Sequence, residues 1–403
     1  MTPDPGAPNA LWPLPAHTPQ QFSNIHAARA YAHDPSRPPP RSRLRQVSAQ
    51  SECAQPVVGL VADFPTTPDS RHVMSADGIA PGSIATTLLV IAYRMRDTIA
   101  EAIASALAQT VACEIIVSDD CSGDGTLEAA QVAIPDDVGP HRISVRSTPQ
   151  NLGLCGHLNE LAGIARGDVL VFLAGDDVAY PQRVERLLAE MAAYPNAMVV
   201  GSSVDDIDPA GKIIAQRTRG LPERLDQRWF LRRGKLQTVL GASMAVRRSL
   251  IADLPPLQGM VEDNMLSLRA ALLGTCRCIP DALLGYRRHD HNLNDWMFDR
   301  SENNYAAYER RNRRVLAMYR GIAADQERCV AASPSLPEER RRLGLELARM
   351  YRLEAEMREA VLDRPRYQWL GPLWRGLKHP GLRRKSAERA LKILLPRRWF
   401  GRS

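Results

Sequence analysis

Short apolar runs alternate with helical repeats from residue 86 onward, and this alternation limits the chain to a small set of folds. The runs TTLLVIA (86–92), EIIVS (114–118) and VLVFL (169–173) are continuous, as in strands buried on both faces of a parallel sheet. Between them, apolar residues recur every three or four positions. The pattern predicts an α/β fold with a doubly wound, mostly parallel sheet, in which ligands bind beyond the carboxyl ends of the strands.

The rest of this region fits the same pattern. Further strands are expected at 143–146, 198–204, 212–216, 276–279 and 283–287, and further helices at 156–165, 181–194 and 262–273. We therefore predict one α/β domain over residues 83–299. Residues 1–82 are rich in proline, which predicts a disordered leader, whereas residues 300–403 are helix-prone and predict an accessory helical C-terminal region.

The positive charge of the chain belongs to its C-terminal region. The whole chain has a formal net charge of +7, and residues 300–403 hold 25 Lys or Arg against 12 Asp or Glu. A basic tail favours an anionic partner, and no recognised nucleic-acid-binding module accompanies it, so no nucleic acid is expected. Arg383 to Lys385 precede an apolar stripe made of Ala387, Ala390, Leu391, Leu394 and Leu395. That stripe suits either an anionic membrane surface or packing on the domain.

The sequence has neither the apolar length of a membrane span nor the pattern of a secretory signal. Its seven cysteines lack the spacing of a disulfide framework, which favours reduced thiols. These features predict a cytoplasmic protein. Peripheral attachment to the inner face of the cell membrane stays open, through the basic tail.

An acidic, glycine-rich segment, SDDCSGDGT at 118–126, follows the second apolar run. Two adjacent carboxylates at a strand end are costly to bring together unless they bind hydrogen-bond donors or a cation. Asp119 and Asp120 suit the imide N–H of a uracil-like base and the hydroxyls of a ribose. An Asp/Gly-rich turn without function is the alternative.

A second acidic pair, Asp176 and Asp177 in the sequence AGDD, follows the apolar run at 169–173. Carboxylate oxygens bind Mn²⁺ or Mg²⁺, which bridges the two phosphates of a nucleotide diphosphate and neutralises the charge of the leaving group. One such pair is often an ordinary loop. Two pairs at the ends of separate strands of one sheet favour a shared function.

Two more polar groups lie near the end of the domain. Glu262 and Asp263 head a predicted helix, where they suit either the helix dipole or the role of general base. The sequence YRRHDHN at 286–292 offers His289 as a metal or diphosphate ligand and Arg287 or Arg288 as phosphate contacts. A solvated basic cluster is the alternative for that sequence.

The order of these motifs resembles the inverting family-2 glycosyltransferases, which have a glycosyltransferase A-type fold. The resemblance covers residues 83–293 and rests on TTLLVIAY, SALAQT, EIIVSDDCSGDGT, NLGLCGHLNELAGIARGD, VFLAGDD, VEDN and YRRHDHN. By this resemblance Asp120 would contact the nucleotide base, with Ala92 and Tyr93 at the nucleotide-facing end of the first strand. Asp176 would contact the ribose or diphosphate.

The resemblance also implies a reaction. One sugar would pass from a nucleotide-diphosphate sugar, a UDP-sugar by preference, to a hydroxyl of a glycan or lipid-linked precursor, with inversion at the anomeric carbon. Asp177 would hold Mn²⁺ or Mg²⁺, with His289 as a second candidate ligand, and Asp263 would be the catalytic base. Enzymes of this kind build polysaccharides of the cell envelope.

The sequence departs from the family pattern at three positions. Ala92 stands where a threonine is usual, Arg94 stands where an asparagine commonly follows the tyrosine, and Ala174 replaces the first acid of a fuller Asp-x-Asp-Asp string. No Gln-x-x-Arg-Trp string follows Asp263 and no membrane span is found in the sequence, which favours transfer of one sugar over processive polymerisation.

Two other functions are compatible with parts of the sequence. A sugar-nucleotide nucleotidyltransferase also binds a nucleotide and a metal, although it needs a glycine-rich phosphate loop that YRMRDT at 93–98 lacks. A catalytically silent nucleotide-sugar-binding or scaffold protein is the alternative from another class, because Ala174 removes one acid. Turnover of a donor with Mn²⁺ separates the enzyme from the scaffold.

Overall fold

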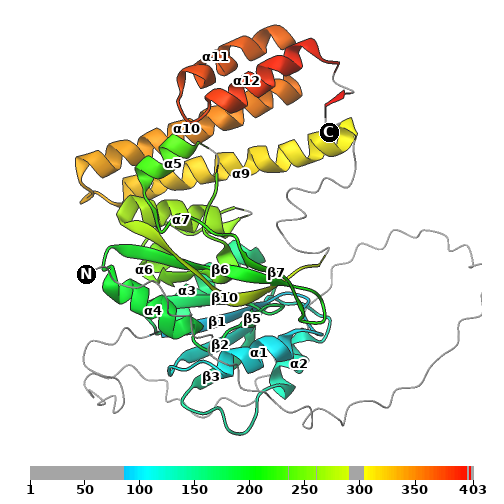
Figure 1. Ribbon diagram of the computed structural model, residues 1–403, viewed down its shortest axis with the longest axis vertical. Helices are drawn as coiled ribbons and strands as arrows, with labels where there is room; N and C mark the ends of the chain where they lie inside the picture. The colour runs from blue at the N-terminus through cyan, green and yellow to red at the C-terminus, as the bar shows by residue number, and fades with distance from the viewer. Residues whose placement is uncertain (1–85, 235, 260, 290–303, 397–398, 401–403) are drawn as a thin grey trace, which may run out of the picture. The chain divides into compact units, whose positions relative to one another are not determined.

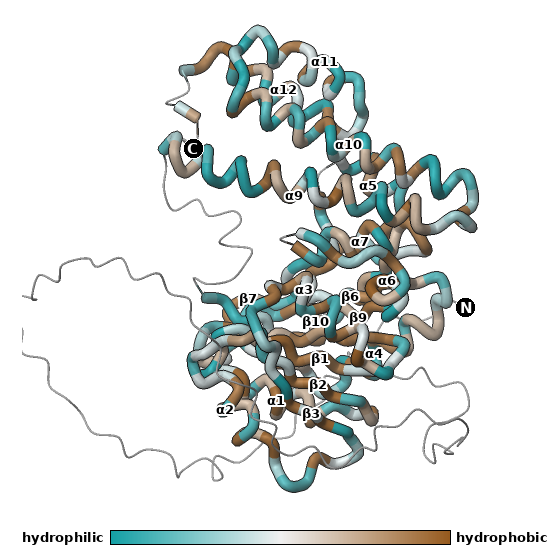
Figure 2. Tube along the Cα trace, turned by 180° about the vertical axis from the view of Figure 1, so that it is seen from behind, coloured by the Kyte–Doolittle hydropathy of each residue, from teal (hydrophilic) through white to brown (hydrophobic). Residues whose placement is uncertain are grey.

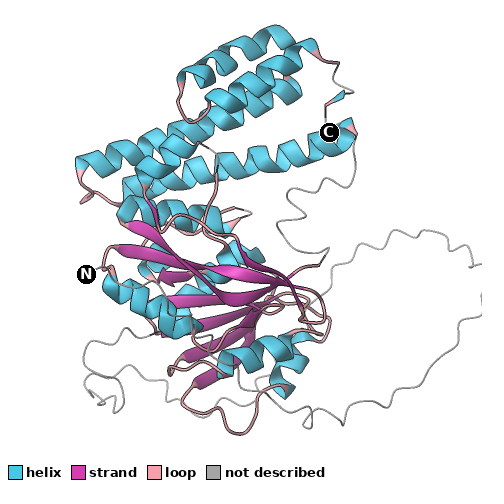
Figure 3. Cartoon of the chain, in the orientation of Figure 1, coloured by secondary structure: helices cyan, strands magenta, loops and turns pink. Residues whose placement is uncertain are grey.

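The computed structural model describes residues 86–400, apart from residues 235, 260, 290–303 and 397–398. One mixed sheet has the strand order β3-β2-β1-β4-β9-β6-β10-β5, with β7 paired to β6 and β8 to β10 (Figures 1 and 3). Parallel pairing joins β3, β2, β1 and β4, and also β6 and β10. Strands β5, β7, β8 and β9 pair antiparallel. The predicted α/β fold is confirmed.

The strands are β1 (Thr86–Ala92), β2 (Glu114–Asp119), β3 (Arg142–Ser147), β4 (Val169–Ala174), β5 (Val178–Ala179), β6 (Ala197–Ile207), β7 (Ile213–Thr218), β8 (Arg224–Leu225), β9 (Ala245–Arg247) and β10 (Thr275–Arg287). The helices among them are α1 (Ile99–Leu107), α2 (Thr126–Val132), α3 (Gly153–Ile164), α4 (Arg183–Ala193), α5 (Gln227–Arg233), α6 (Ser249–Ala252) and α7 (Glu262–Leu273), with the 3₁₀ turn η1 (Gly241–Ser243). The C-terminal helices are α9 (Tyr305–Ala332), α10 (Glu338–Asp363), α11 (Leu370–Lys378) and α12 (Arg383–Leu391), with the 3₁₀ turns η2 (Arg366–Trp369) and η3 (Lys392–Leu394).

Alternate residues of the central strands feed two hydrophobic layers, because successive side chains of a strand point to opposite faces. Leu88 and Val90 of β1 join the layer that contains α1, α2 and α4. Leu89 joins the layer that contains α3, α6 and α7. The central strands are accordingly hydrophobic along their length (Figure 2). Burial on both faces is the reason that these strands are continuous apolar runs in the sequence.

The C-terminal helices pack on the α7 side of the sheet. Their buried side chains belong to the same hydrophobic cluster as those of α3 and α7. The buried guanidinium of Arg269 in α7 donates to the Asp325 carboxylate of α9 at 2.6 and 2.9 Å. The buried Glu354 of α10 accepts hydrogen bonds from Arg389 near the end of α12, at 2.7 and 2.8 Å. Packing is continuous from sheet to helices, and the boundary between residues 299 and 300 stays a prediction.

Most expected elements are present near their expected bounds, with two differences. The strands expected at 276–279 and 283–287 form the single strand β10, whose register against β6 shifts between Ile279 and Ala282. Pro280 lies in this shift, where its missing N–H costs no ladder hydrogen bond. The helix expected through Leu395 ends at Leu391 and continues as η3.

Three predictions about the rest of the chain can be compared with the structure only in part. The Pro-rich leader, 1–82, lies outside the described residues. Within the residues described, no helix is both long and apolar enough to cross a membrane. Cysteines 113, 155, 276, 278 and 329 are buried and unpaired, whereas Cys121 is disulfide-bonded, which contradicts the expectation of reduced thiols at that position.

Candidate active site

The carboxyl ends of the strands bring the expected site residues to one edge of the sheet. Ala92 at the end of β1 is paired with Asp119 at the end of β2, and Ile91 is paired with Ala174 at the end of β4. Strands β6 and β10 run parallel to each other and end at the same edge. Because β9 is antiparallel to β4, the turn η1 that precedes β9 also lies there.

Asp119 and Asp120 are buried, and hydrogen bonds hold both carboxylates. Asp119 accepts from the backbone N–H of Ser122 at 3.0 Å and also from the Ser122 hydroxyl. Oδ1 of Asp120 accepts from the Thr148 hydroxyl at 3.0 Å and from the Leu152 N–H at 2.9 Å. Asp119 therefore stabilises the loop that follows β2. Thr148 and Leu152, between β3 and α3, fix the orientation of Asp120.

The end of β1 joins the loop that follows β2. Ala92 is buried and its carbonyl accepts the N–H of Asp120 at 2.9 Å, whereas Tyr93 is 42% exposed. Arg94 has a φ of 57°, in the left-handed region, and its N–H donates to the Ser122 hydroxyl at 2.7 Å. Asparagine tolerates that backbone conformation better than arginine does.

The two carboxylates of the Asp176–Asp177 pair are both buried but have different partners. Oδ2 of Asp176 lies 2.7 Å from Nε2 of His289. Asp177 is 1% exposed, and its Oδ1 accepts the backbone N–H of Arg287 at 2.9 Å. Oδ2 of Asp177 is buried and makes no hydrogen bond. Burial, and then the charge of Asp176, raise the pKa of Asp177 well above its ordinary value.

Arg287 holds the loops of this edge together and is not exposed to a ligand. Arg287 is only 2% exposed. Its Nε donates to the carbonyl of Asp176 at 2.7 Å, and its Nη1 donates to the carbonyls of Asp208 and Pro209 at 3.1 and 2.7 Å. Its Nη2 also pairs with Glu101. These bonds use the Arg287 guanidinium inside the protein, so of the two arginines expected to contact phosphate, Arg287 or Arg288, the geometry favours Arg288.

The acid pair at the start of α7 lies beside η1. An added Cβ on Gly241 would meet Oε1 of Glu262 at 2.2 Å and Cβ of Asp263 at 3.6 Å. Burial raises the pKa of Glu262 to about 7. Burial, and then the charge of Glu262, raise the pKa of Asp263 well above its ordinary value, and Oδ1 of Asp263 is buried without a hydrogen-bond partner.

Arg219 and Tyr286 connect the two acidic pairs. The guanidinium of Arg219 acts against the rise in the pKa of Asp263, and it lies 5.5 Å from the centre of the Tyr286 ring. Burial, and then the charge of Asp177, raise the pKa of the Tyr286 phenol, with Asp176 adding to the effect. The charges of the general-base candidate and of the Asp176–Asp177 pair therefore act within one site.

The donor set at Asp176 and His289 suits a divalent metal ion. In the described parts of the chain, no group of three or more His, Cys, Asp or Glu side chains is arranged to hold a metal. The pair itself offers a carboxylate oxygen and an imidazole nitrogen 2.7 Å apart, which are groups that Mn²⁺ accepts. At nucleotide sites, phosphates and water commonly complete the coordination. Asp177, the expected ligand, is enclosed instead.

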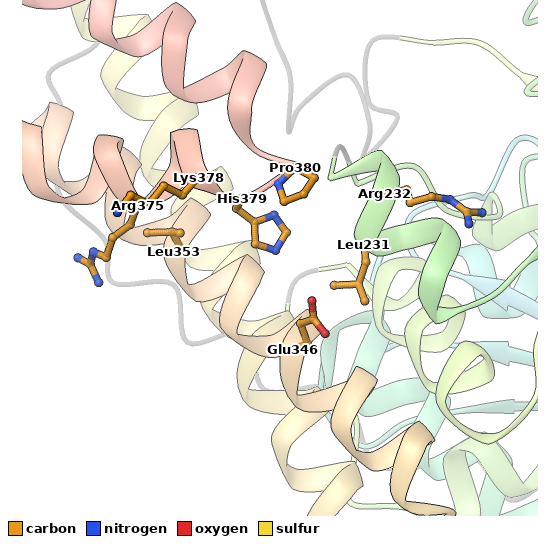
Figure 4. Close-up of a pocket in the computed structure, with 8 residues that line it drawn as sticks. All are labelled: Leu231, Arg232, Glu346, Leu353, Arg375, Lys378, His379 and Pro380. Carbon is orange, nitrogen blue, oxygen red and sulfur yellow. The ribbon is translucent and has the colours of Figure 1, made fainter.

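The cavity drawn in Figure 4 belongs to another part of the protein. It measures about 350 Å³ and is lined by residues of α5, α10 and α11, among them Arg232, Arg375 and Lys378, and by His379 just after α11. The side chains of Arg232 and Arg375 point away from each other in Figure 4, so they do not converge on one ligand. None of the acidic residues at the sheet edge lines it.

Two residues of the site were not identified from the sequence. Arg219 lies in the loop after β7 with a φ of 64°, and no sequence pattern marks it. Gly241 has no special φ, and its role follows only from the contact with Glu262. The one available signal for Gly241 is that a glycine stands just before β9, the strand that begins at the same sheet edge.

Part of the chain is similar in sequence to known proteins. Residues 87–254 match the family model described as glycosyl transferase family 2. Succinoglycan biosynthesis protein ExoO of Rhizobium meliloti (strain 1021) is 36% identical over 142 residues, 35% of this chain and 39% of that protein. Putative glycosyltransferase EpsE of Bacillus subtilis (strain 168) is 33% identical over 134 residues, 32% of this chain and 47% of that protein. Each match spans less than half of the relative.

Among solved structures, S. aureus TarS 1-349 in complex with UDP-GlcNAc aligns with a TM-score of 0.48 and 16% identity, over 77% of this chain and 89% of that chain. The segment matched by the family model contains Asp119, Asp120, Asp176 and Asp177, and it ends before Asp263 and His289. The part of the chain that carries both Asp–Asp pairs is therefore similar to glycosyl transferase family 2.

Proposed function

We propose that this protein transfers one sugar from a nucleotide-diphosphate sugar, a UDP-sugar by preference, to a hydroxyl of a glycan or lipid-linked acceptor. The observation that carries the proposal is the gathering of three acidic groups at one sheet edge. Two of them, Asp176–Asp177 and Glu262–Asp263, interact electrostatically with Tyr286 and Arg219, respectively, and these two side chains lie beside each other. Two of these groups suit a nucleotide diphosphate, and the third, Asp263, suits the removal of a proton.

Asp120 is our candidate for the residue that recognises the nucleotide base. Its Oδ1 is held by Thr148 and Leu152, so the carboxylate keeps one orientation, which is what selective recognition of an N–H donor needs. The exposed ring of Tyr93 supplies a flat apolar surface for the base at the same edge. Asp119 and the buried Ala92 support the loop that carries Asp120.

Asp176 and His289 are our candidates for holding a divalent ion, Mn²⁺ or Mg²⁺. Once bound with the donor, the ion would neutralise charge on the departing diphosphate. Asp177 takes the role of a positioning residue in this proposal. Its Oδ1 accepts the N–H of Arg287, and that bond holds the end of β10, two residues before His289.

Asp263 is our candidate for the catalytic base. The acceptor oxygen forms a bond to the anomeric carbon while the bond from that carbon to the diphosphate oxygen breaks, and the diphosphate leaves with the electron pair. Asp263 takes the hydroxyl proton. Attack opposite to the leaving group inverts the anomeric configuration. A carboxyl with a raised pKa suits this step, because a stronger base accepts the proton more readily near neutral pH.

The names of two relatives support the proposed acceptor class. The name of ExoO refers to succinoglycan biosynthesis, and EpsE is named a putative glycosyltransferase. We propose that this chain likewise builds a polysaccharide of the cell envelope, at the cytoplasmic side of the membrane.

A panel of nucleotide sugars with Mn²⁺ tests the proposed function. We expect release of nucleotide diphosphate from one UDP-sugar, loss of release with a chelator, and recovery on adding Mn²⁺. Binding of a nucleotide sugar without turnover, even with acceptors present, would instead support the scaffold protein. Formation of a nucleotide sugar from a nucleoside triphosphate and a sugar phosphate would support the nucleotidyltransferase.

A further inference from the structure

The helical hairpin of α11 and α12 carries an exposed apolar surface. Exposed large hydrophobic side chains gather on it, and six of them form what we name the outer face: Tyr367, Leu370, Trp374, Leu391, Leu394 and Leu395. Tyr367, Leu370 and Trp374 follow one another at helical spacing, with exposed fractions of 72%, 61% and 61%. Leu394 is 82% exposed. Most monomeric proteins bury or scatter such residues, so a gathered set marks a contact surface.

The two halves of the outer face lie at the same end of the hairpin. Arg366 donates from Nη2 to the carbonyl of Leu395 at 2.5 Å, which joins η2 to the end of η3. An added Cβ on Gly376 would lie 2.2 Å from Oγ of Ser386, so α11 and α12 are in close contact farther along. Both helices lie beside α10 in Figures 1 and 2.

The inner faces of the hairpin are used in packing, which leaves the outer face for a partner. Leu373 and Gly376 of α11 are buried, and Ser386 of α12 donates to Sδ of Met357 in α10 at 3.1 Å. Burial alone would raise the pKa of Glu354, yet hydrogen bonds from Arg389 lower this pKa to about 2. These hydrogen bonds anchor α12 on α10. The sequence offered packing or membrane contact as alternatives for this region, and the packing contacts use only the inner faces of the hairpin.

The charge around the outer face selects an anionic partner. Residues 366–403 contain eleven Lys or Arg and one acidic residue, Glu388, which accepts a hydrogen bond from Arg384 at 2.9 Å. Lys378 and Arg383 are exposed near the hairpin turn, and Nζ of Lys378 lies 5.1 Å from the centre of the Trp374 ring. Aromatic rings with neighbouring Lys and Arg are the side chains that membrane interfaces favour.

We propose that the outer face of the α11–α12 hairpin docks on an anionic lipid bilayer. Tyr367, Leu370 and Trp374 enter the headgroup boundary, and Lys378 and Arg383 contact lipid phosphates. The hairpin is held closely against the glycosyltransferase domain, because an added Cβ on Gly234, at the end of α5, would meet the carbonyl oxygen of Gly381 at 1.7 Å. Docking of the hairpin therefore brings the domain to the membrane with it. This proposal does not depend on the sugar or on the catalytic residues.

Vesicle sedimentation with the full chain tests the proposal. We expect binding to vesicles with phosphatidylglycerol, little binding to pure phosphatidylcholine vesicles, and weaker binding at high salt. The double variant Leu370→Ser, Trp374→Ser should bind the anionic vesicles at least about tenfold more weakly, because it loses the apolar contact with the headgroup boundary.

The matched control is Ile213→Ser, Ile214→Ser, which removes two exposed isoleucines of β7 in the glycosyltransferase domain. It should bind vesicles like the parent, and all three proteins should have the same thermal midpoint. Equal vesicle binding by the parent and the Leu370/Trp374 variant would overturn the proposal, as would no binding by the parent. Tighter binding of an RNA oligonucleotide than of anionic vesicles, unchanged in the double variant, would point to nucleic acid and overturn it too.

Discussion

The Asp325 carboxylate of α9 receives two hydrogen bonds from the guanidinium of Arg269, and both residues are buried. Arg269 lies on α7, the helix that begins with Glu262 and Asp263. It also donates to the carbonyls of Leu250 and Pro255, at 2.8 and 2.7 Å. The first C-terminal helix is thus bonded to the helix that carries the proposed catalytic base.

Asp325→Ala should destabilise the protein by roughly 3–5 kcal/mol, because it leaves the Arg269 charge buried without its carboxylate. Chemical denaturation followed by circular dichroism measures the change. The matched control is Glu327→Ala on the same helix, whose partner Arg352 lies at the surface at 2.7 Å. Loss of that exposed pair should cost less than about 1 kcal/mol. Equal effects of the two variants would show that the buried pair does not hold the helices together.

The variants Asp176→Asn and Asp177→Asn show which of the two carboxylates binds the metal ion. Asp176→Asn should weaken Mn²⁺ binding at least about tenfold, because it removes the carboxylate charge beside His289. Asp177→Asn should leave Mn²⁺ binding nearly unchanged, since an amide oxygen still accepts the Arg287 N–H. Calorimetric titration of Mn²⁺ in the presence of UDP measures both. A larger loss of Mn²⁺ binding in Asp177→Asn than in Asp176→Asn would show that Asp177 is the metal ligand.

Glu262→Gln should move the pH dependence of transfer to lower pH. The negative charge of Glu262 raises the pKa of Asp263, so its removal lowers that pKa and the base is formed at lower pH. The same substitution should also change how the stability of the protein depends on pH. Burial raises the pKa of Glu262 from 4.5 to about 7, so the parent loses stability as pH rises across that interval, and the glutamine variant should lose less. Profiles of kcat/KM and of Tm against pH check this; coincident profiles would contradict it.

Arg94→Asn should stabilise the protein by about 0.5–1 kcal/mol, because asparagine tolerates the left-handed backbone at this position better than arginine does. Arg96→Asn is the control, since Arg96 has no positive φ, and it should give no such gain. Thermal unfolding measures both variants. A destabilised Arg94→Asn would mean that contacts of the arginine side chain outweigh the backbone term.

The strands and the location of the acidic edge could be predicted because they depend on local patterns. Apolar runs such as 86–92 and 169–173 mark strands buried on both faces, and parallel strands place their carboxyl ends together. The direction of each side chain there could not be predicted. Asp176 and Asp177 are adjacent in sequence, yet one meets His289 and the other is enclosed by Arg287, through contacts with a strand more than a hundred residues away.

The exposed stripe of α11 was missed for a different reason. Pro365, Pro372 and Pro380 together disfavour a helix in this region of the sequence, although Pro372 falls in the first turn of α11, where a missing N–H costs nothing. Which face of α11 is covered depends on α10 and α12, and a single helix does not reveal that.

Asp263→Asn, measured for donor binding and for turnover in the same preparation, tests the central claim most directly. The amide keeps the shape of the side chain but does not take a proton, so we expect UDP-sugar affinity like that of the parent and a fall in kcat of at least about 100-fold. Glu262→Gln, the neighbouring substitution of the same kind, should keep most of the activity at its own optimal pH. Near-parental kcat in Asp263→Asn, with donor binding intact, would contradict the account.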